Sequence, residues 1–183
     1  MKLKFKKQDF QTEAVNAVAD LFVGQEKLKS SFTIQSDNPQ QTIENEYGVG
    51  NKLLIDIKTL LANMHAVQKR YNLPQTEFDL NDSKADGGVS DGARVVTKEG
   101  AAITTGNNVP QFSVEMETGT GKTYVYTKTI FELNKRYGFT KFIIVVPSVA
   151  IREGVHKSLQ VTQDHFANQY DNVPCRYFIY NSS

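Results

Sequence analysis

Cysteine, net charge and long apolar runs are all scarce in this sequence of 183 residues. The single cysteine, Cys175, excludes a disulfide within the chain, and its apolar surroundings predict a buried strand residue. No run approaches the roughly 20 apolar residues that a membrane-spanning helix needs, and the lysine-rich N-terminus lacks the apolar stretch of a signal peptide. We therefore expect a cytoplasmic protein without membrane association. The net charge of +1 creates no global basic field that would attract nucleic acid, although it leaves room for a local basic groove.

The chain does contain enough apolar residues to fold around a core, at 39% hydrophobic and 22% charged. Its most informative segment is Met-Glu-Thr-Gly-Thr-Gly-Lys-Thr at positions 116 to 123. This segment follows an alternating run at 112–116 and precedes a helical pattern. A glycine-rich loop between a strand and a helix is the setting of a phosphate-binding loop. The alternative is a glycine turn that happens to precede Lys-Thr.

Each residue type in this loop suits a phosphate ligand. Backbone N–H groups of such a turn converge on an anion, and the following helix points its positive end at the same place. Gly119 and Gly121 allow positive φ and a close approach of the main chain. Lys122 can reach the β- and γ-phosphates, and the Thr123 hydroxyl can bind Mg²⁺. The residues predicted to bind ATP are Thr118, Gly119, Thr120, Gly121, Lys122 and Thr123. Met116 stands where the usual pattern opens with Gly or Ala.

The N-terminal part, residues 1–23, is predicted to form a short strand and a helix. Lysine and apolar residues alternate from Lys2 to Lys6. Asp9 can cap a helix from about Phe10 to Val23. Gln11 lies near its start, and a glutamine amide can read the edge of an adenine ring. An exposed helical glutamine without function is the alternative.

Residues 24–110 are predicted to be a polar insertion. Positions 24–50 have the composition of a loop, and a helix is expected from about Lys52 to Arg70 with Asn51 as its cap. Asp82 to Gly92 should be mobile or disordered, and the runs at 94–97 and 101–104 could form a hairpin.

Residues 111–183 show a βαβαβ pattern. After the loop, a helix is expected from Lys122 to Tyr137, ending at Gly138. The unbroken apolar run at 141–146 is typical of a parallel strand buried on both faces. Ser148 can cap a helix that runs to about Leu159, and a further strand is expected at 175–180. The ligand would then lie at the carboxyl ends of the strands.

Three segments together resemble the opening motifs of superfamily 2 helicases, and most closely the Res subunits of type III restriction enzymes. They are Phe-Gln-Thr-Glu-Ala-Val from 10, the loop at 116–123, and Val-Pro-Ser at 146–148 followed by Ile-Arg-Glu-Gly at 151–154. The resemblance covers about 8–23 and 110–183. It implies an α/β P-loop NTPase, here an incomplete RecA-like parallel sheet flanked by helices.

The same resemblance assigns roles to residues. It implies that Gln11 contacts adenine, that Lys122 is the catalytic lysine on the phosphates, and that Thr123 binds Mg²⁺. Ser148 and Arg152 would contact the nucleic-acid backbone, with a helix cap and a solvated arginine as the alternative. For the parent protein it implies ATP-driven DNA translocation and cleavage together with a Mod methyltransferase subunit.

Some family features have no counterpart in these 183 residues. They hold no apolar strand that ends in Asp-Glu-x-His, no second motor domain and no nuclease carboxylates. We therefore expect an N-terminal fragment with negligible ATPase activity and weak nucleotide binding. Three alternatives stay open: an RNA helicase, a non-catalytic nucleotide-binding or docking module, and a P-loop kinase, which would leave Gln11 unexplained. His65, His156 and His165 are scattered and are expected to be structural.

Overall fold

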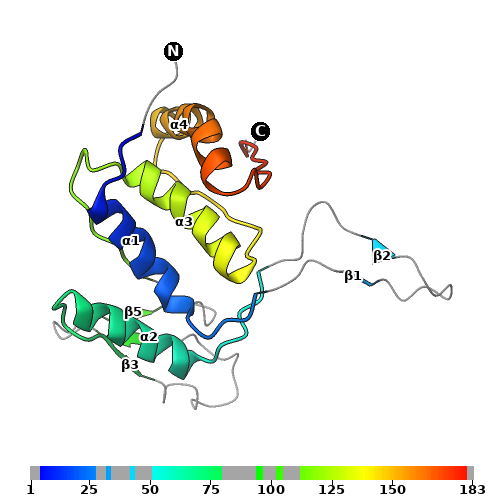
Figure 1. Cartoon of the computed structure of the whole chain (residues 1–183). Helices are drawn as coiled ribbons and strands as arrows, with labels where there is room; N and C mark the ends of the chain where they lie inside the picture. Colours follow the sequence, from blue (N-terminus) through cyan, green and yellow to red (C-terminus); the bar gives the residue numbers. More distant parts are fainter. Residues whose placement is uncertain are drawn as a thin grey trace. The chain divides into compact units, whose positions relative to one another are not determined.

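The computed structural model of the chain describes residues 5–27, 51–79 and 112–180, and the backbone of five short strands outside or at the ends of these ranges (Figure 1). The chain divides into two compact units, and each is described by itself. The first unit comprises Met1–Ala19, Glu26–Lys52 and Thr118–Ser183. The second comprises Asp20–Gln25 and Leu53–Glu117.

Three helices make up the described core of the first unit: α1 (Asp9–Ala19), α3 (Lys122–Tyr137) and α4 (Val149–Gln169). Helix α3 packs against both α1 and α4, and lies between them in Figure 1. Phe131 of α3 stacks on Phe166 and Tyr170, with ring centroids 5.1 and 5.2 Å apart. Val15 and Ala19 are the buried residues of α1. These apolar contacts fix α3, and therefore the loop that leads into it.

The ends of α3 are where the sequence predicts them. Gly121 precedes the helix and Gly138 follows it, both in the left-handed region that glycine adopts without strain. Helix α4 also begins as predicted, after Ser148, but continues to Gln169 rather than ending near Leu159. The extra turns are stabilised by burial of Thr162 and Phe166.

In the second unit, α2 (Ile57–Arg70) packs against the 3-10 turn η1 (Asp20–Phe22). The predicted start at Lys52 with Asn51 as cap was wrong. Asp56 is the cap, and its carboxylate accepts the Thr59 N–H at 2.8 Å. The Leu54 N–H is instead donated to the Gln25 side chain at 2.8 Å, so this part of the chain is held outside the helix.

Two small antiparallel sheets complete the described elements. Strands β1 (Phe32–Thr33) and β2 (Thr42–Ile43) pair in the first unit. In the second unit, β3 (Glu77–Asp79) pairs with β4 (Arg94–Val96), which pairs with β5 (Ala102–Thr104). The pairing of Val95 with Ile103 confirms the predicted hairpin. The predicted mobile segment at 82–92 and most of the predicted strand at 2–6 lie outside the described residues.

The predicted parallel sheet stays a prediction. None of the segments 112–116, 141–146 and 175–180 is assigned to a strand. Ile143 and Val145 are 91% and 87% exposed, contrary to the expected burial on both faces. The physical reason is that burial of a parallel strand needs paired neighbours, and the described residues supply none for this segment. Cys175 is likewise exposed and outside any strand, which corrects its predicted burial.

Candidate nucleotide-binding site

The loop from Thr118 to Gly121 turns sharply into the first residue of α3. Gly119 and Gly121 have φ values of +82° and +85°, where a side chain would be strained. The N-cap residue of α3 is Gly121, which has no side chain to cap the helix by a hydrogen bond. The first N–H groups of a helix have no partner within the helix. The loop therefore presents backbone donors that suit a phosphate group.

Gln11 lies against this loop although it is 109 positions away in the sequence. Its Nε2 donates a hydrogen bond of 2.9 Å to the Thr120 carbonyl oxygen. A Cβ on Gly121 would lie only 2.7 Å from the same Nε2. The backbone conformation of Gly121 therefore favours glycine, and a side chain at this position would also displace the Gln11 amide from its present place.

Lys122 and Thr123 occupy the first two positions of α3. Lys122 is exposed, so its ammonium can reach a ligand on the loop, and Thr123 is half-buried. The described residues contain no group of three or more side chains that could hold a metal ion. A magnesium ion at Thr123 would therefore depend on phosphate oxygens and water for most of its ligands, as magnesium commonly does. With that condition, the residues present fit a magnesium–triphosphate group.

Ser148 and Arg152 both lie at the start of α4. The Ser148 hydroxyl accepts the Ile151 N–H at 3.3 Å and so caps the helix. The Arg152 guanidinium forms a 3.1 Å ion pair with Glu153. The helix cap that the sequence offered as the alternative role of Ser148 is thus present, whereas Arg152 is ion-paired rather than simply solvated. A cap leaves the hydroxyl at the helix N-terminus, where a backbone phosphate would also be stabilised.

Sequence reasoning missed Thr12 and Lys128. Lys128 as a residue is only 5% exposed, and its Nζ donates to the Thr12 hydroxyl at 3.4 Å. Burial lowers the Lys128 pKa, the nearby Lys7 lowers it further, and Glu132 opposes the shift. A signal was available in the sequence, because Lys128 falls three positions from both Val125 and Phe131 on the buried face of α3.

A second polar network lies further along α3. Glu132 accepts hydrogen bonds from Arg136 at 2.8 Å and from the Tyr170 hydroxyl at 2.9 Å. Burial alone would raise the Glu132 pKa, but these hydrogen bonds outweigh it and the pKa falls. Burial, together with the bond to Glu132, raises the pKa of Tyr170. Arg136 also donates to the Asn16 side chain at 2.7 Å, which ties α3 to α1.

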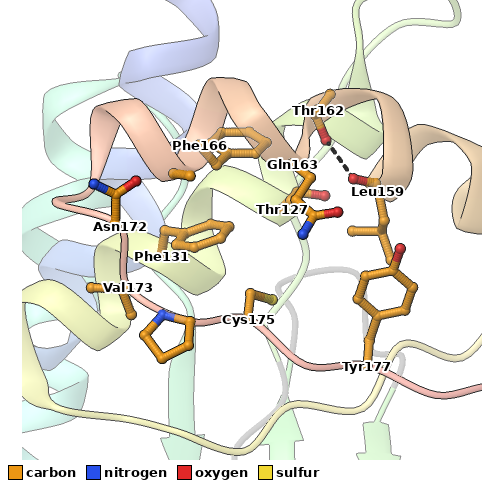
Figure 2. A pocket seen from close by; sticks show the side chains of 12 residues that line it. Thr127, Phe131, Leu159, Thr162, Gln163, Phe166, Asn172, Val173, Cys175 and Tyr177 are labelled. Carbon is orange, nitrogen blue, oxygen red and sulfur yellow. Dashed lines mark hydrogen bonds between the residues drawn. The ribbon is translucent and has the colours of Figure 1, made fainter.

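A pocket of about 180 Å³ lies elsewhere in the first unit, between α3, α4 and the segment that follows α4 (Figure 2). Phe131, Phe166 and Val173 form much of its apolar lining, and Cys175 borders it. Partial burial of the thiol raises the Cys175 pKa, even though the residue as a whole is exposed. Neither Gln11 nor any loop residue lines this pocket, so it is separate from the candidate nucleotide site.

Comparison with known proteins connects the chain to one family. The family described as "Type III restriction enzyme, res subunit" matches residues 4–176. The chain is 53% identical over 60 residues to the Res subunit of the type III restriction-modification enzyme EcoPI from Escherichia phage P1. It is 49% identical over 62 residues to the StyLTI Res subunit of Salmonella typhimurium.

These similarities cover about a third of the chain, 32% and 33%, and only 6% of each relative. The chain thus spans a small part of the length of the relatives it matches. No solved structure matches it. No helix among the described residues is both long and apolar enough to cross a membrane.

Proposed function

This chain belongs to the Res subunit family of type III restriction enzymes, and from that premise we propose that it binds ATP as part of a DNA-translocating motor. The observation that carries the proposal is the hydrogen bond between Gln11 and the Thr120 carbonyl. It joins the residue expected to read adenine to the loop expected to hold the phosphates. A phosphate loop alone would not favour one nucleotide base over another.

In the proposed complex, the loop from Thr118 to Thr123 cradles the triphosphate through its backbone N–H groups. Lys122 neutralises charge on the β- and γ-phosphates, and Thr123 binds Mg²⁺. A glutamine amide has two N–H donors and one oxygen acceptor. Since Gln11 donates one hydrogen bond to Thr120, its second N–H and its oxygen are the groups that would pair with the adenine edge.

Membership of this family also supports a proposal for the activity of the whole protein. The names of the matched relatives describe subunits of restriction-modification enzymes. We infer a cytoplasmic enzyme that moves along duplex DNA and cleaves it together with a Mod methyltransferase subunit. Ser148 and Arg152 are the proposed contacts to the DNA backbone. The 183-residue chain alone is proposed to lack hydrolytic activity, because it contains no Asp-Glu-x-His segment.

The direct test is Lys122→Ala. An ionic hydrogen bond is worth about 1.5–3 kcal/mol, so the Kd for magnesium–ATP should rise roughly tenfold to a hundredfold. Isothermal titration calorimetry measures this directly. Lys135→Ala is a matched control, because Lys135 is an exposed lysine on the same helix that lies over the Tyr170 ring. Unchanged affinity in Lys122→Ala would contradict the proposal and favour a docking module in which the loop plays no part.

A further inference from the structure

Helices α1 and α3 are joined along their length by polar contacts. The contacts begin at the loop, where Gln11 meets Thr120, and end where the Tyr137 hydroxyl donates to the Ala19 carbonyl at 2.9 Å. Because the starts of both helices meet and the ends of both helices meet, the helices run in the same direction (Figure 1). The two contacts in between are Lys128 with Thr12 and Arg136 with Asn16.

The contact between Lys128 and Thr12 needs a physical explanation. Burying an ammonium costs several kcal/mol unless partners replace its hydration. Lys128 has three donors, and the partner that the structure gives its Nζ is a neutral hydroxyl at the long distance of 3.4 Å. Its neighbour Glu132 uses its two carboxylate oxygens for Arg136 and Tyr170. An apolar side chain of similar volume would pack here at least as favourably.

The contact between Lys128 and Thr12 lies at the first turn of α1, next to Gln11. The Thr12 hydroxyl accepts from Lys128 and donates to the Gln8 carbonyl at 3.2 Å, so the three groups form one chain of hydrogen bonds. This chain holds the first turn of α1, which is the turn that carries Gln11. Gln11 has a long flexible side chain, and ordering such a side chain costs conformational entropy. Fixing its backbone reduces the number of positions that its amide can reach.

We propose that Thr12 and Lys128 are positioning residues that hold Gln11 at the phosphate loop and thereby give the site its preference for adenine. The inference rests on the proposed ATP binding. Neither residue touches the nucleotide in this proposal. The phosphate cradle is built from the loop itself, and so its affinity for a bare triphosphate does not depend on them.

The test compares two ligands, magnesium–ATP and magnesium–tripolyphosphate, in the purified protein. In Thr12→Val and in Lys128→Met, the Kd for ATP should rise about threefold to tenfold, the worth of one hydrogen bond. The Kd for tripolyphosphate should stay within about twofold. Gln11→Ala should show the same pattern, and combining it with Thr12→Val should add little, because both changes remove the same interaction.

Controls separate positioning from simple loss of stability. Lys128→Met should unfold at the same temperature as the unmodified protein or higher, and Lys135→Met should change neither Kd. Should Lys128→Met fail to fold, Thr12→Val carries the same prediction. The inference would be overturned if the variants lost affinity for both ligands equally, or if they lost no affinity for ATP. An unmodified protein that binds neither ligand would overturn the proposed function itself, and the inference with it.

Discussion

Two lysines on α3 show how position decides what a residue does. Lys122 is exposed beside the loop, whereas Lys128, six positions later, is buried against α1. We propose that the same ammonium group binds a ligand at the first position and holds neighbouring residues in place at the second. The sequence motif identifies the first lysine, because its neighbours in the chain define the loop. Only packing against Thr12, far away in the sequence, identifies the second.

His165 provides a prediction at this scale. Its Nε2 lies 2.9 Å from the Tyr124 hydroxyl, and the Phe5 ring packs on its imidazole with centroids 4.7 Å apart. Burial, and then the charge of Lys128, lower the His165 pKa below 6.5. The folded state therefore resists a proton that the unfolded state accepts. The contribution of this histidine to the free energy of unfolding is fully present above about pH 6.5, and it is lost as the pH drops below that value.

Urea unfolding at a series of pH values measures this effect. Between about pH 6.5 and 5, the free energy of unfolding should decrease, and His165→Gln should reduce that decrease. His156→Gln serves as the control, since His156 lies in the same helix and makes an edge contact with the Tyr177 ring. An identical pH dependence in His165→Gln and the unmodified protein would show that this histidine is not responsible.

At the scale of the element, the start of α4 combines a structural role with a proposed functional one. The Ser148 hydroxyl caps the helix, and aspartate is as good a cap as serine. Ser148→Ala should therefore cost about 1 kcal/mol of stability, whereas Ser148→Asp should cost almost none. If Ser148 also faces a DNA phosphate, the carboxylate of Ser148→Asp will repel it and DNA affinity will fall. Chemical denaturation and fluorescence anisotropy with labelled duplex measure the two effects. Undiminished DNA binding by Ser148→Asp would leave Ser148 as a cap alone.

Element boundaries were predictable where the deciding interactions are local. The two glycines that flank α3 and the serine before α4 are such signals. The start of α2 was not predictable, because its apolar pattern continues upstream of the true helix. There the chain is held by partners distant in sequence: Gln25 binds Leu54, and Asn51 accepts the N–H groups of Thr140 and Lys141 at 2.8 and 3.1 Å.

At the scale of the whole molecule, the question is whether these residues are sufficient for catalysis. Phosphoryl transfer depends on placing the metal, the attacking water and the phosphates together. The loop is the proposed site of the phosphates, and the 183 residues contain no Asp-Glu-x-His segment to place the water. We expect this chain to bind magnesium–ATP and to hydrolyse it negligibly. A steady-state phosphate-release assay with and without duplex DNA measures this, and substantial DNA-stimulated hydrolysis would contradict it.

The sequence by itself determined the glycine turn before α3, the two ends of α3, the first residue of α4 and the resemblance that the family comparison confirmed. These features depend on interactions between residues that are close in sequence, so a short segment is enough to predict them. The tertiary structure alone decided that Gln11 meets Thr120, that Lys128 is buried on Thr12 and that α2 begins at Ile57. Each of these joins or is set by residues far apart in sequence, and only the packing of the folded chain brings them together.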